Sequence, residues 1–107
     1  MRQNGLKQVL LQAVDEGLSS LGDSPKQAIF FHLESSFGIK KSNIPSNLRE
    51  FAEALEEIFG LGASYLEQLI IRRFYDKLGL EFEEVENWNL SEYVDSVRRR
   101  RAQSQER

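Results

Sequence analysis

The sequence contains no cysteine and only one histidine, His32, among its 107 residues. The missing cysteine excludes disulfides and thiolate chemistry and fits a reducing compartment. A single histidine excludes a histidine-rich metal site, and any Ser-His-Asp arrangement would have to use His32. The sequence also lacks an apolar run of signal-peptide or membrane-spanning length. We therefore expect a cytoplasmic protein that makes no membrane contact.

Charge is divided unevenly along the chain. Residues 1–97 carry 9 Lys and Arg against 16 Asp and Glu, a net charge of −7, whereas residues 98–107 carry 5 Arg against 1 Glu, a net charge of +4. Hydrophobic residues make up 40% of the sequence, which is enough for an independent core. We expect one acidic helical domain over residues 1–97, which should repel a polyanion, and a basic, largely disordered tail over residues 98–107.

Apolar residues recur at helical spacing along most of the chain, which predicts an all-α fold, a compact bundle of about five helices. Two of these helices meet at Gly60-Leu61-Gly62, and we expect them to form a central helical hairpin. Residues 80–85 are expected to be an extended connector that docks its apolar side chains. The predicted helices are residues 6–21, 25–37 with Ser24 as N-cap, 47–59 with Ser46 as N-cap, 62–78, and 90–97.

Short-range signals bear on two of these helices. Gly17 lies inside the first helix and weakens that prediction, because glycine is a poor helix former. Asn89 followed by Glu92 predicts a capping box at the start of the last helix, with Trp88 packed against Tyr93 as a hydrophobic staple.

Two features resemble ligand sites but have simpler explanations. His32 falls at the edge of an apolar helix face, so we favour a rim histidine over a catalytic base. The carboxylate clusters lack the spacing and turn glycine of a calcium loop, so we interpret them as solvated faces. These clusters are Glu53, Glu56 and Glu57, and Glu83, Glu84 and Glu86.

The glycine junction, residues 60–62, invites comparison with a helix-hairpin-helix motif, in which backbone amides hold a DNA phosphate. However, residues 60–71 contain no Lys or Arg, and the preceding helix is acidic. We favour a glycine C-cap in which Leu61 covers the helix end.

Glu67 falls within the apolar stripe of the helix expected over residues 62–78. A buried carboxylate needs a partner or a raised pKa. We expect Glu67 to be a buried polar residue that accepts hydrogen bonds from a neighbouring helix's backbone or from a basic side chain. The alternative is a functional acid, but no base, nucleophile or metal-ligand set accompanies it. We therefore predict that the protein is not an enzyme and has no catalytic residues, cofactor or metal site.

Three apolar residues fall outside the expected core. Phe31 points away from the apolar face of its helix, and Tyr65 and Leu69 lie opposite Phe74 on theirs. Exposed aromatic side chains of this kind mark contact with a protein partner or with a second copy of the chain. The alternative is a central helix that buries both of its sides.

The tail carries the one feature typical of nucleic-acid binding. Arg98, Arg99, Arg100 and Arg101 can neutralise phosphates without sequence specificity. The tail contains no aromatic residue that could stack on bases. Cations at a helix C-terminus also complement the helix dipole, which is the simpler explanation.

Across residues 13–79, several blocks of sequence resemble a small archaeal helical domain, the Nitrosopumilus-type output domain. Members of that family occur as stand-alone proteins or as terminal modules of signalling proteins, and the resemblance implies no enzymatic activity. The blocks are Ser20-Leu21-Gly22, residues 28–34, Phe37-Gly38-Ile39, Ile44-Pro45, residues 51–60, Gly62-Ala63, Leu66-Glu67, Phe74-Tyr75 and Leu78-Gly79.

We therefore expect a non-catalytic protein-interaction module in signalling or regulation that binds an unidentified protein or a second copy of itself. The alternative is a nucleic-acid-associated protein that binds phosphates through Arg98–Arg101.

Overall fold

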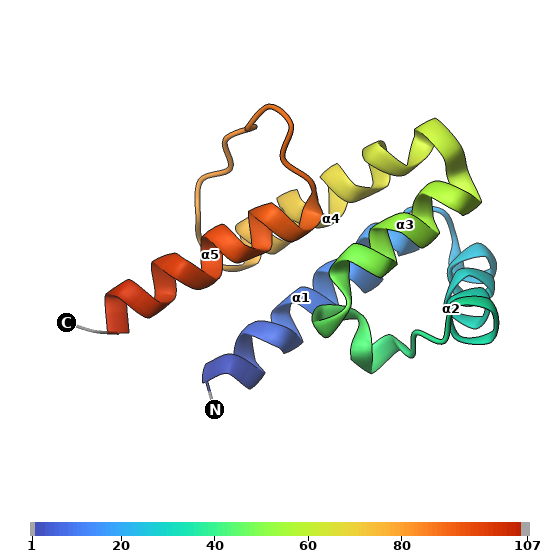
Figure 1. The fold of residues 1–107 in the computed structure, drawn as a ribbon, viewed down its shortest axis with the longest axis horizontal. Helices are drawn as coiled ribbons and strands as arrows, with labels where there is room; N and C mark the ends of the chain where they lie inside the picture. Colours follow the sequence, from blue (N-terminus) through green and yellow to red (C-terminus); the bar gives the residue numbers. More distant parts are fainter. Residues whose placement is uncertain (1, 106–107) are drawn as a thin grey trace.

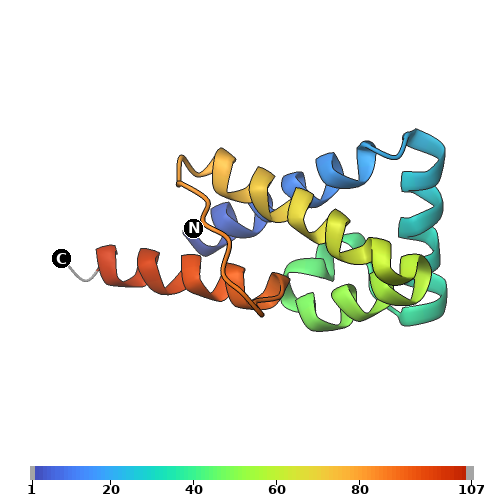
Figure 2. The same ribbon diagram turned by 90° about the horizontal axis from the view of Figure 1, so that it is seen from above.

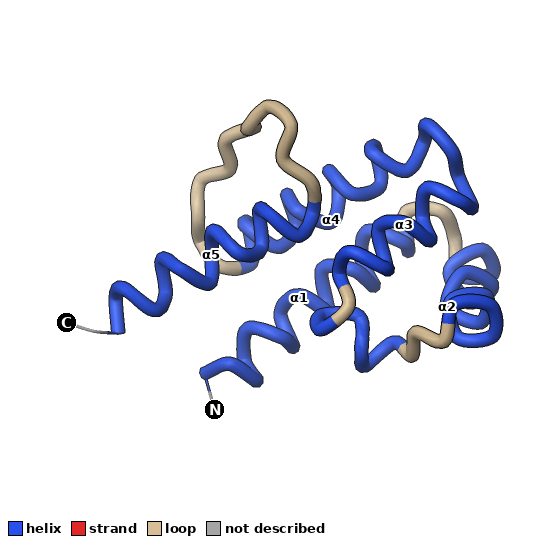
Figure 3. The backbone as a smooth tube through the Cα atoms, viewed as in Figure 1, coloured by secondary structure: helices blue, strands red, loops and turns tan. Residues whose placement is uncertain are grey.

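The computed structural model describes residues 2–105, and over this range all regular structure is helical (Figures 1 and 3). This confirms the predicted all-α class. Five α-helices are joined by turns, two short 3-10 helices (η1 and η2) and one long connector over residues 78–89. In order along the chain, the elements are α1 (Arg2–Ser19), α2 (Asp23–Phe37), η1 (Lys41–Ser46), α3 (Leu48–Phe59), η2 (Gly60–Gly62), α4 (Ala63–Lys77) and α5 (Leu90–Gln105).

Helices α1 and α4 run in opposite directions side by side through the middle of the molecule (Figures 1 and 2). α2 lies across one end of this pair, and the last turns of α5 project from the other end (Figure 2). The radius of gyration is 13.7 Å, slightly above the ~13 Å typical of a compact chain of this length.

The core is formed by apolar residues from every α-helix and from η1. α1 and α4 approach so closely at Gly17 that a Cβ added there would lie 2.7 Å from Cγ1 of Ile70. The glycine that weakened the helix prediction is therefore explained by packing, since any larger residue would displace Ile70. The largest fully buried side chains are Phe51, Phe74, Leu10, Leu18, Leu33, Ile44, Leu55, Ile70, Ile71, Leu90, Val14 and Val94.

The predicted helix ends lie within about two residues of the observed ones, except that α1 begins four residues earlier and α5 ends later, and two predicted N-caps are wrong. α2 begins at Asp23 after Gly22, one residue ahead of the predicted Ser24 cap. α3 begins at Leu48 after Asn47, because the predicted cap Ser46 ends η1. Gly22 has no side chain that could cap α2, and the Asn47 side chain makes no capping bond to α3.

The start of α5 is as predicted. Asn89 and Glu92 form a reciprocal capping box, in which the Asn89 N–H donates to Glu92 Oε1 at 2.8 Å and the Glu92 N–H donates to Asn89 Oδ1 at 3.0 Å. Trp88 packs edge-on against Tyr93 with 5.2 Å between ring centroids. The Tyr93 hydroxyl accepts a hydrogen bond from the Val85 N–H at 2.9 Å, which fixes the connector against α5.

The end of α5 differs from the sequence-based expectation. The helix continues through Arg98–Arg101 to Gln105, where the sequence analysis expected fraying and disorder. Arginine, alanine and glutamine are good helix formers, so residues 98–105 can extend a helix whose start is already packed. Residues 106 and 107 of the expected tail lie outside the described residues.

The predicted hairpin at the glycine junction is present, since η2 joins α3 to α4 and these helices contact each other. α4 nevertheless packs more extensively on α1 than on α3. The side chain of Leu61 is 98% exposed, so the expectation that it covers the end of α3 is wrong.

Candidate protein-interaction groove

An open, mainly apolar hollow of about 370 Å³ lies between α2 and α3. Phe31 forms part of its wall and is 73% exposed, although it is a large aromatic residue. The remaining lining residues are Ala28, Ile29, His32 and Ile58, so α2 supplies four of the five side chains and α3 supplies one. We call these five residues the α2–α3 groove.

The groove has the chemistry of a protein contact and lacks that of a small-molecule site. His32 is the only polar residue in its lining. Small-molecule sites pair an apolar wall with several convergent polar groups that fix the ligand's orientation. An apolar side chain of a partner protein needs no such groups, and clustered apolar anchors in a pocket dominate many protein interfaces.

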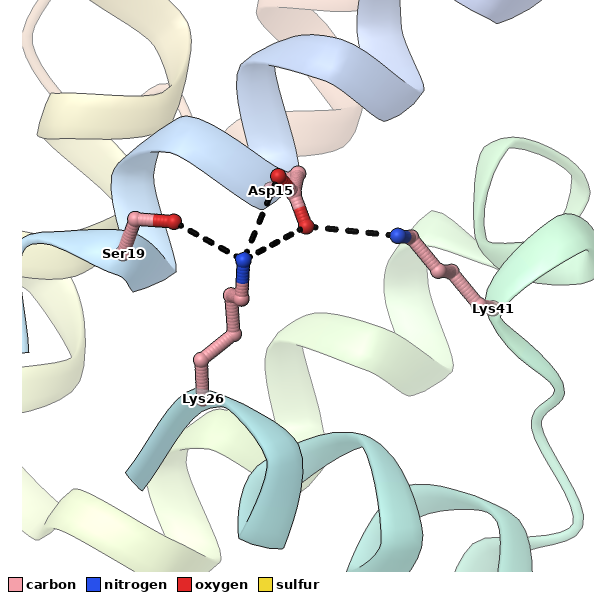
Figure 4. Close-up of polar contacts among 4 residues, drawn as sticks. All are labelled: Asp15, Ser19, Lys26 and Lys41. Carbon is pink, nitrogen blue, oxygen red and sulfur yellow. Dashed lines mark hydrogen bonds and ion pairs between the residues drawn. The ribbon is translucent and has the colours of Figure 1, made fainter. Parts of the chain in front are cut away.

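Ion pairs made by Asp15 of α1 hold the start of α2 in place (Figure 4). The Nζ atoms of Lys26 and Lys41 each lie 3.2 Å from Asp15 Oδ1, and Lys26 also bonds Ser19 Oγ at 3.1 Å. Burial raises the pKa of Asp15, but hydrogen bonds from Lys26 and Lys41 and their positive charges outweigh it, so the net pKa is lowered. The carboxylate therefore stays ionised and joins α1, the start of α2 and η1.

His32 lies on the exposed side of α2, consistent with the rim position expected for it. Its ring packs edge-on against Phe37 with 5.6 Å between centroids, and Nδ1 is 3.3 Å from Ser36 Oγ. Within residues 2–105, no hydrogen bond or ion pair joins His32 to a carboxylate, so nothing there orients this Ser-His pair as a triad would.

Tyr65 and Leu69, both on α4, do not line the α2–α3 groove. Tyr65 is 68% exposed, whereas Leu69 is half-buried and packs against the core. Leu69 lines a second hollow with Phe82 and three charged residues of α4, and this hollow shares no residue with the α2–α3 groove. Of the three residues predicted as a possible interaction surface, Phe31 and Leu69 therefore line two separate hollows, and Tyr65 lines neither of them.

Glu67 is half-buried at the side of α4 that faces α3, where the sequence expected a fully buried carboxylate. Burial, and secondarily the negative charge of Glu56, raises the pKa of Glu67 to about 7. Among residues 2–105, neither a hydrogen bond nor an ion pair satisfies its carboxylate, so the expected donor from a neighbouring helix is absent there. Partial exposure resolves the discrepancy, because water reaches the carboxylate.

The four arginines of α5 are exposed, as expected for them. Arg98 is partly engaged, since it donates to Asp95 Oδ1 at 3.4 Å and to the Pro45 carbonyl at 3.3 Å. Arg99, Arg100 and Arg101 form no ion pair with any other side chain in the part of the chain that the structure describes.

Comparisons with known proteins identify no relative, since no family model, curated protein or solved structure matches this chain. The resemblance to the Nitrosopumilus-type output domain therefore stays a prediction. Across residues 2–105, no three His, Cys, Asp or Glu side chains are placed to hold a metal ion. No α-helix within this range has the length and apolar character that crossing a membrane requires.

Sequence reasoning identified Phe31 but missed Ala28 and Ile58, its neighbours in the groove. Ile58 continues the apolar face that Leu55 places in the core, so the helical pattern marks it as buried. The groove is lined by residues of two different helices, and no spacing within one helix encodes how the two are placed against each other.

Proposed function

We propose that this chain is a non-catalytic protein-interaction module that binds its partner through the α2–α3 groove. The observation that carries the proposal is the exposure of Phe31 beside an open apolar hollow. Leaving such a side chain in water forgoes about 1.5–3 kcal/mol of burial free energy, and a bound partner would recover part of it. A role in signalling or regulation, at the level of the resembling family, is part of the same proposal.

The test compares how well two variants, each lacking one exposed aromatic ring, retain a binding partner. Phe31→Ser removes the exposed aromatic ring of the groove, and Tyr65→Ser removes an equally exposed ring from the outer face of α4. Both variants should fold with wild-type helicity and melting, because surface substitutions change stability by about 0.5 kcal/mol or less.

The immobilised wild-type protein and the Tyr65→Ser variant should retain the same polypeptide from an extract of the source cells, and the Phe31→Ser variant should lose it. Retention by Phe31→Ser together with loss by Tyr65→Ser would move the contact to the outer face of α4. Sedimentation at increasing protein concentration reports whether the retained partner is a second copy of the chain.

A second candidate function is phosphate binding by Arg98–Arg101, favoured by their exposure on the projecting end of α5 (Figure 2). The acidic remainder of the chain opposes it, because residues 1–97 carry a net charge of −7. Deleting residues 98–107 should abolish any nucleic-acid binding and leave folding unchanged. Binding that survives this deletion, or that does not weaken as salt rises, would exclude the tail as the site.

A further inference from the structure

His32 is the one titratable side chain that lines the α2–α3 groove. The other four lining residues, Ala28, Ile29, Phe31 and Ile58, are apolar. His32 is also the only histidine in the sequence. Histidine is the side chain whose ordinary titration falls between pH 5 and pH 8. A change in the charge of the groove lining near neutral pH can therefore come only from His32.

The ring of His32 is held by residues of its own helix. Its Nδ1 atom lies 3.3 Å from Ser36 Oγ, and the ring packs edge-on against Phe37 with 5.6 Å between the centroids. A hydroxyl can donate or accept a hydrogen bond, so Ser36 can satisfy Nδ1 in either tautomer of the neutral ring. Protonation makes both ring nitrogens donors and adds a positive charge, so the charged ring depends more strongly on water.

The groove supplies no counter-charge for a protonated ring. It is lined by α2 and α3 alone. The charged residues of these two helices are Asp23, Lys26, Glu34, Arg49, Glu50, Glu53, Glu56 and Glu57. Within residues 2–105, none of them lines the groove, and none forms an ion pair or a hydrogen bond with His32. A charged His32 under a bound partner would therefore face apolar side chains without compensation.

Covering the groove with an apolar segment removes water from the part of His32 that the segment contacts. Burial disfavours the charged form of histidine, because the lost hydration is not replaced. The free protein would then accept a proton on His32 more readily than the complex does. By reciprocity, protonation weakens the complex by the same factor, so the affinity for the partner falls as pH falls.

We propose that His32 makes binding at the α2–α3 groove dependent on pH: the groove holds an uncharged apolar segment of another protein while the imidazole is neutral and releases it when the imidazole is protonated. This inference rests on the proposed function and specifies both the chemistry of the bound segment and its regulation.

The probe is an uncharged peptide from a displayed library whose randomised positions exclude Asp, Glu, His, Lys, Arg, Cys and Tyr. The library is selected on the wild-type protein at about pH 8, after peptides that bind Phe31→Ser are removed. The chosen peptide is synthesised with both ends blocked, so that it has no titrating group. Its dissociation constant should rise by about threefold to thirtyfold from about pH 8 to about pH 5, the upper figure applying if the complex excludes the charged ring altogether.

Two variants identify the group responsible for the pH dependence. Glu67 also titrates in this range, because burial and the charge of Glu56 raise its pKa to about 7, but it does not line the groove. His32→Gln keeps a polar side chain without the titration and should make the affinity independent of pH. Glu67→Gln is the matched control and should keep the wild-type pH dependence. Thermal melting at both pH values shows that each variant is folded.

The outcomes separate this inference from the proposed function. Equal wild-type affinity at the two pH values, tighter binding at the lower pH, or a pH dependence that persists in His32→Gln would overturn the inference and leave the groove as an interaction site. Loss of the dependence in Glu67→Gln alone would assign it to the contact between α3 and α4. If no peptide survives removal on Phe31→Ser, the groove does not bind apolar segments, and the proposed function fails together with the inference.

Discussion

Where α1 meets α4, a Cβ added at Gly17 would lie 2.7 Å from Cγ1 of Ile70, whereas between α2 and α3 a hollow of about 370 Å³ stays open. The first contact is built from a glycine and fully buried aliphatic side chains, and the second leaves a phenylalanine 73% exposed. Both pairs are helices of the same chain with apolar faces. The comparison shows that α1 and α4 are closely packed, whereas apolar side chains between α2 and α3 stay exposed to solvent.

This difference in packing is also the reason for proposing that the α2–α3 groove, and not the contact between α1 and α4, binds a partner. A packed interface is a requirement of folding, and residues there are accounted for by stability alone. An open apolar groove contributes little to stability, so its residues call for another explanation, which we take to be a partner. Stability measurements can therefore test the contrast separately from any binding experiment.

The largest expected effect comes from truncating the packed contact. Ile70→Ala should lower the free energy of unfolding by about 2–5 kcal/mol, because it removes one methylene and two methyl groups of a fully buried side chain and leaves a cavity. Phe31→Ala removes more atoms but should change stability by about 0.5 kcal/mol or less. Chemical denaturation of both variants measures the difference, and similar losses for the two would show that the groove is part of the core.

A smaller effect is expected from adding one methyl group at Gly17. Gly17→Ala should destabilise the protein by about 1–2 kcal/mol, because overpacking against Ile70 outweighs the better helix propensity of alanine. Gly5→Ala is the matched control, since nothing lies within 4 Å of a Cβ at that position of α1.

Gly5→Ala should leave stability unchanged or raise it by up to about 1 kcal/mol. Thermal melting of the two variants decides the point. If Gly17→Ala were as stable as Gly5→Ala, α1 and α4 would be packed less tightly than the structure describes.

The smallest effect concerns Glu67, whose pKa is raised to about 7 from the usual 4.5 by burial and by Glu56. Between these values the native state holds a proton that the unfolded state has released, so this group's contribution to stability falls as pH rises. Glu67→Gln removes the titration. It should stabilise the protein by about 1 kcal/mol at pH 8, a value reduced for partial exposure, and by almost nothing at pH 4.

Calorimetry at the two pH values measures this effect. A Glu67→Gln variant that is less stable than the wild type at pH 8 would show that the ionised carboxylate has a partner, as the sequence analysis expected.

The sequence predicted the elements of this fold better than their contacts. The capping box of Asn89 and Glu92 was recognised because its partners are three residues apart. The helix predicted through Gly17 is present, but the reason for a glycine there was not visible, because it lies in α4, more than fifty positions away in the sequence. Glu67 was placed on the correct side of its helix, but its depth depends on how closely α3 covers it, which helical spacing does not encode.

The sequence predicted only part of the α2–α3 groove, because contacts between helices are not encoded in the spacing within one helix. Phe31 stood out because it breaks the apolar pattern of its own helix. Tyr65 and Leu69 stood out equally, although Leu69 is partly buried and lines a different hollow from Phe31, and Tyr65 lines neither hollow. Which exposed apolar residues share a surface depends on helix crossing, and local sequence does not determine that.

Site-specific photo-crosslinking in the source cells tests the central claim, that the α2–α3 groove is the partner site, most directly. A photoreactive phenylalanine analogue replaces Phe31 in one protein and Tyr65 in another, both exposed aromatic positions. The account predicts a discrete crosslinked species, containing a second polypeptide, from position 31 and none from position 65. Crosslinking from position 65 alone, or from neither position, would contradict it.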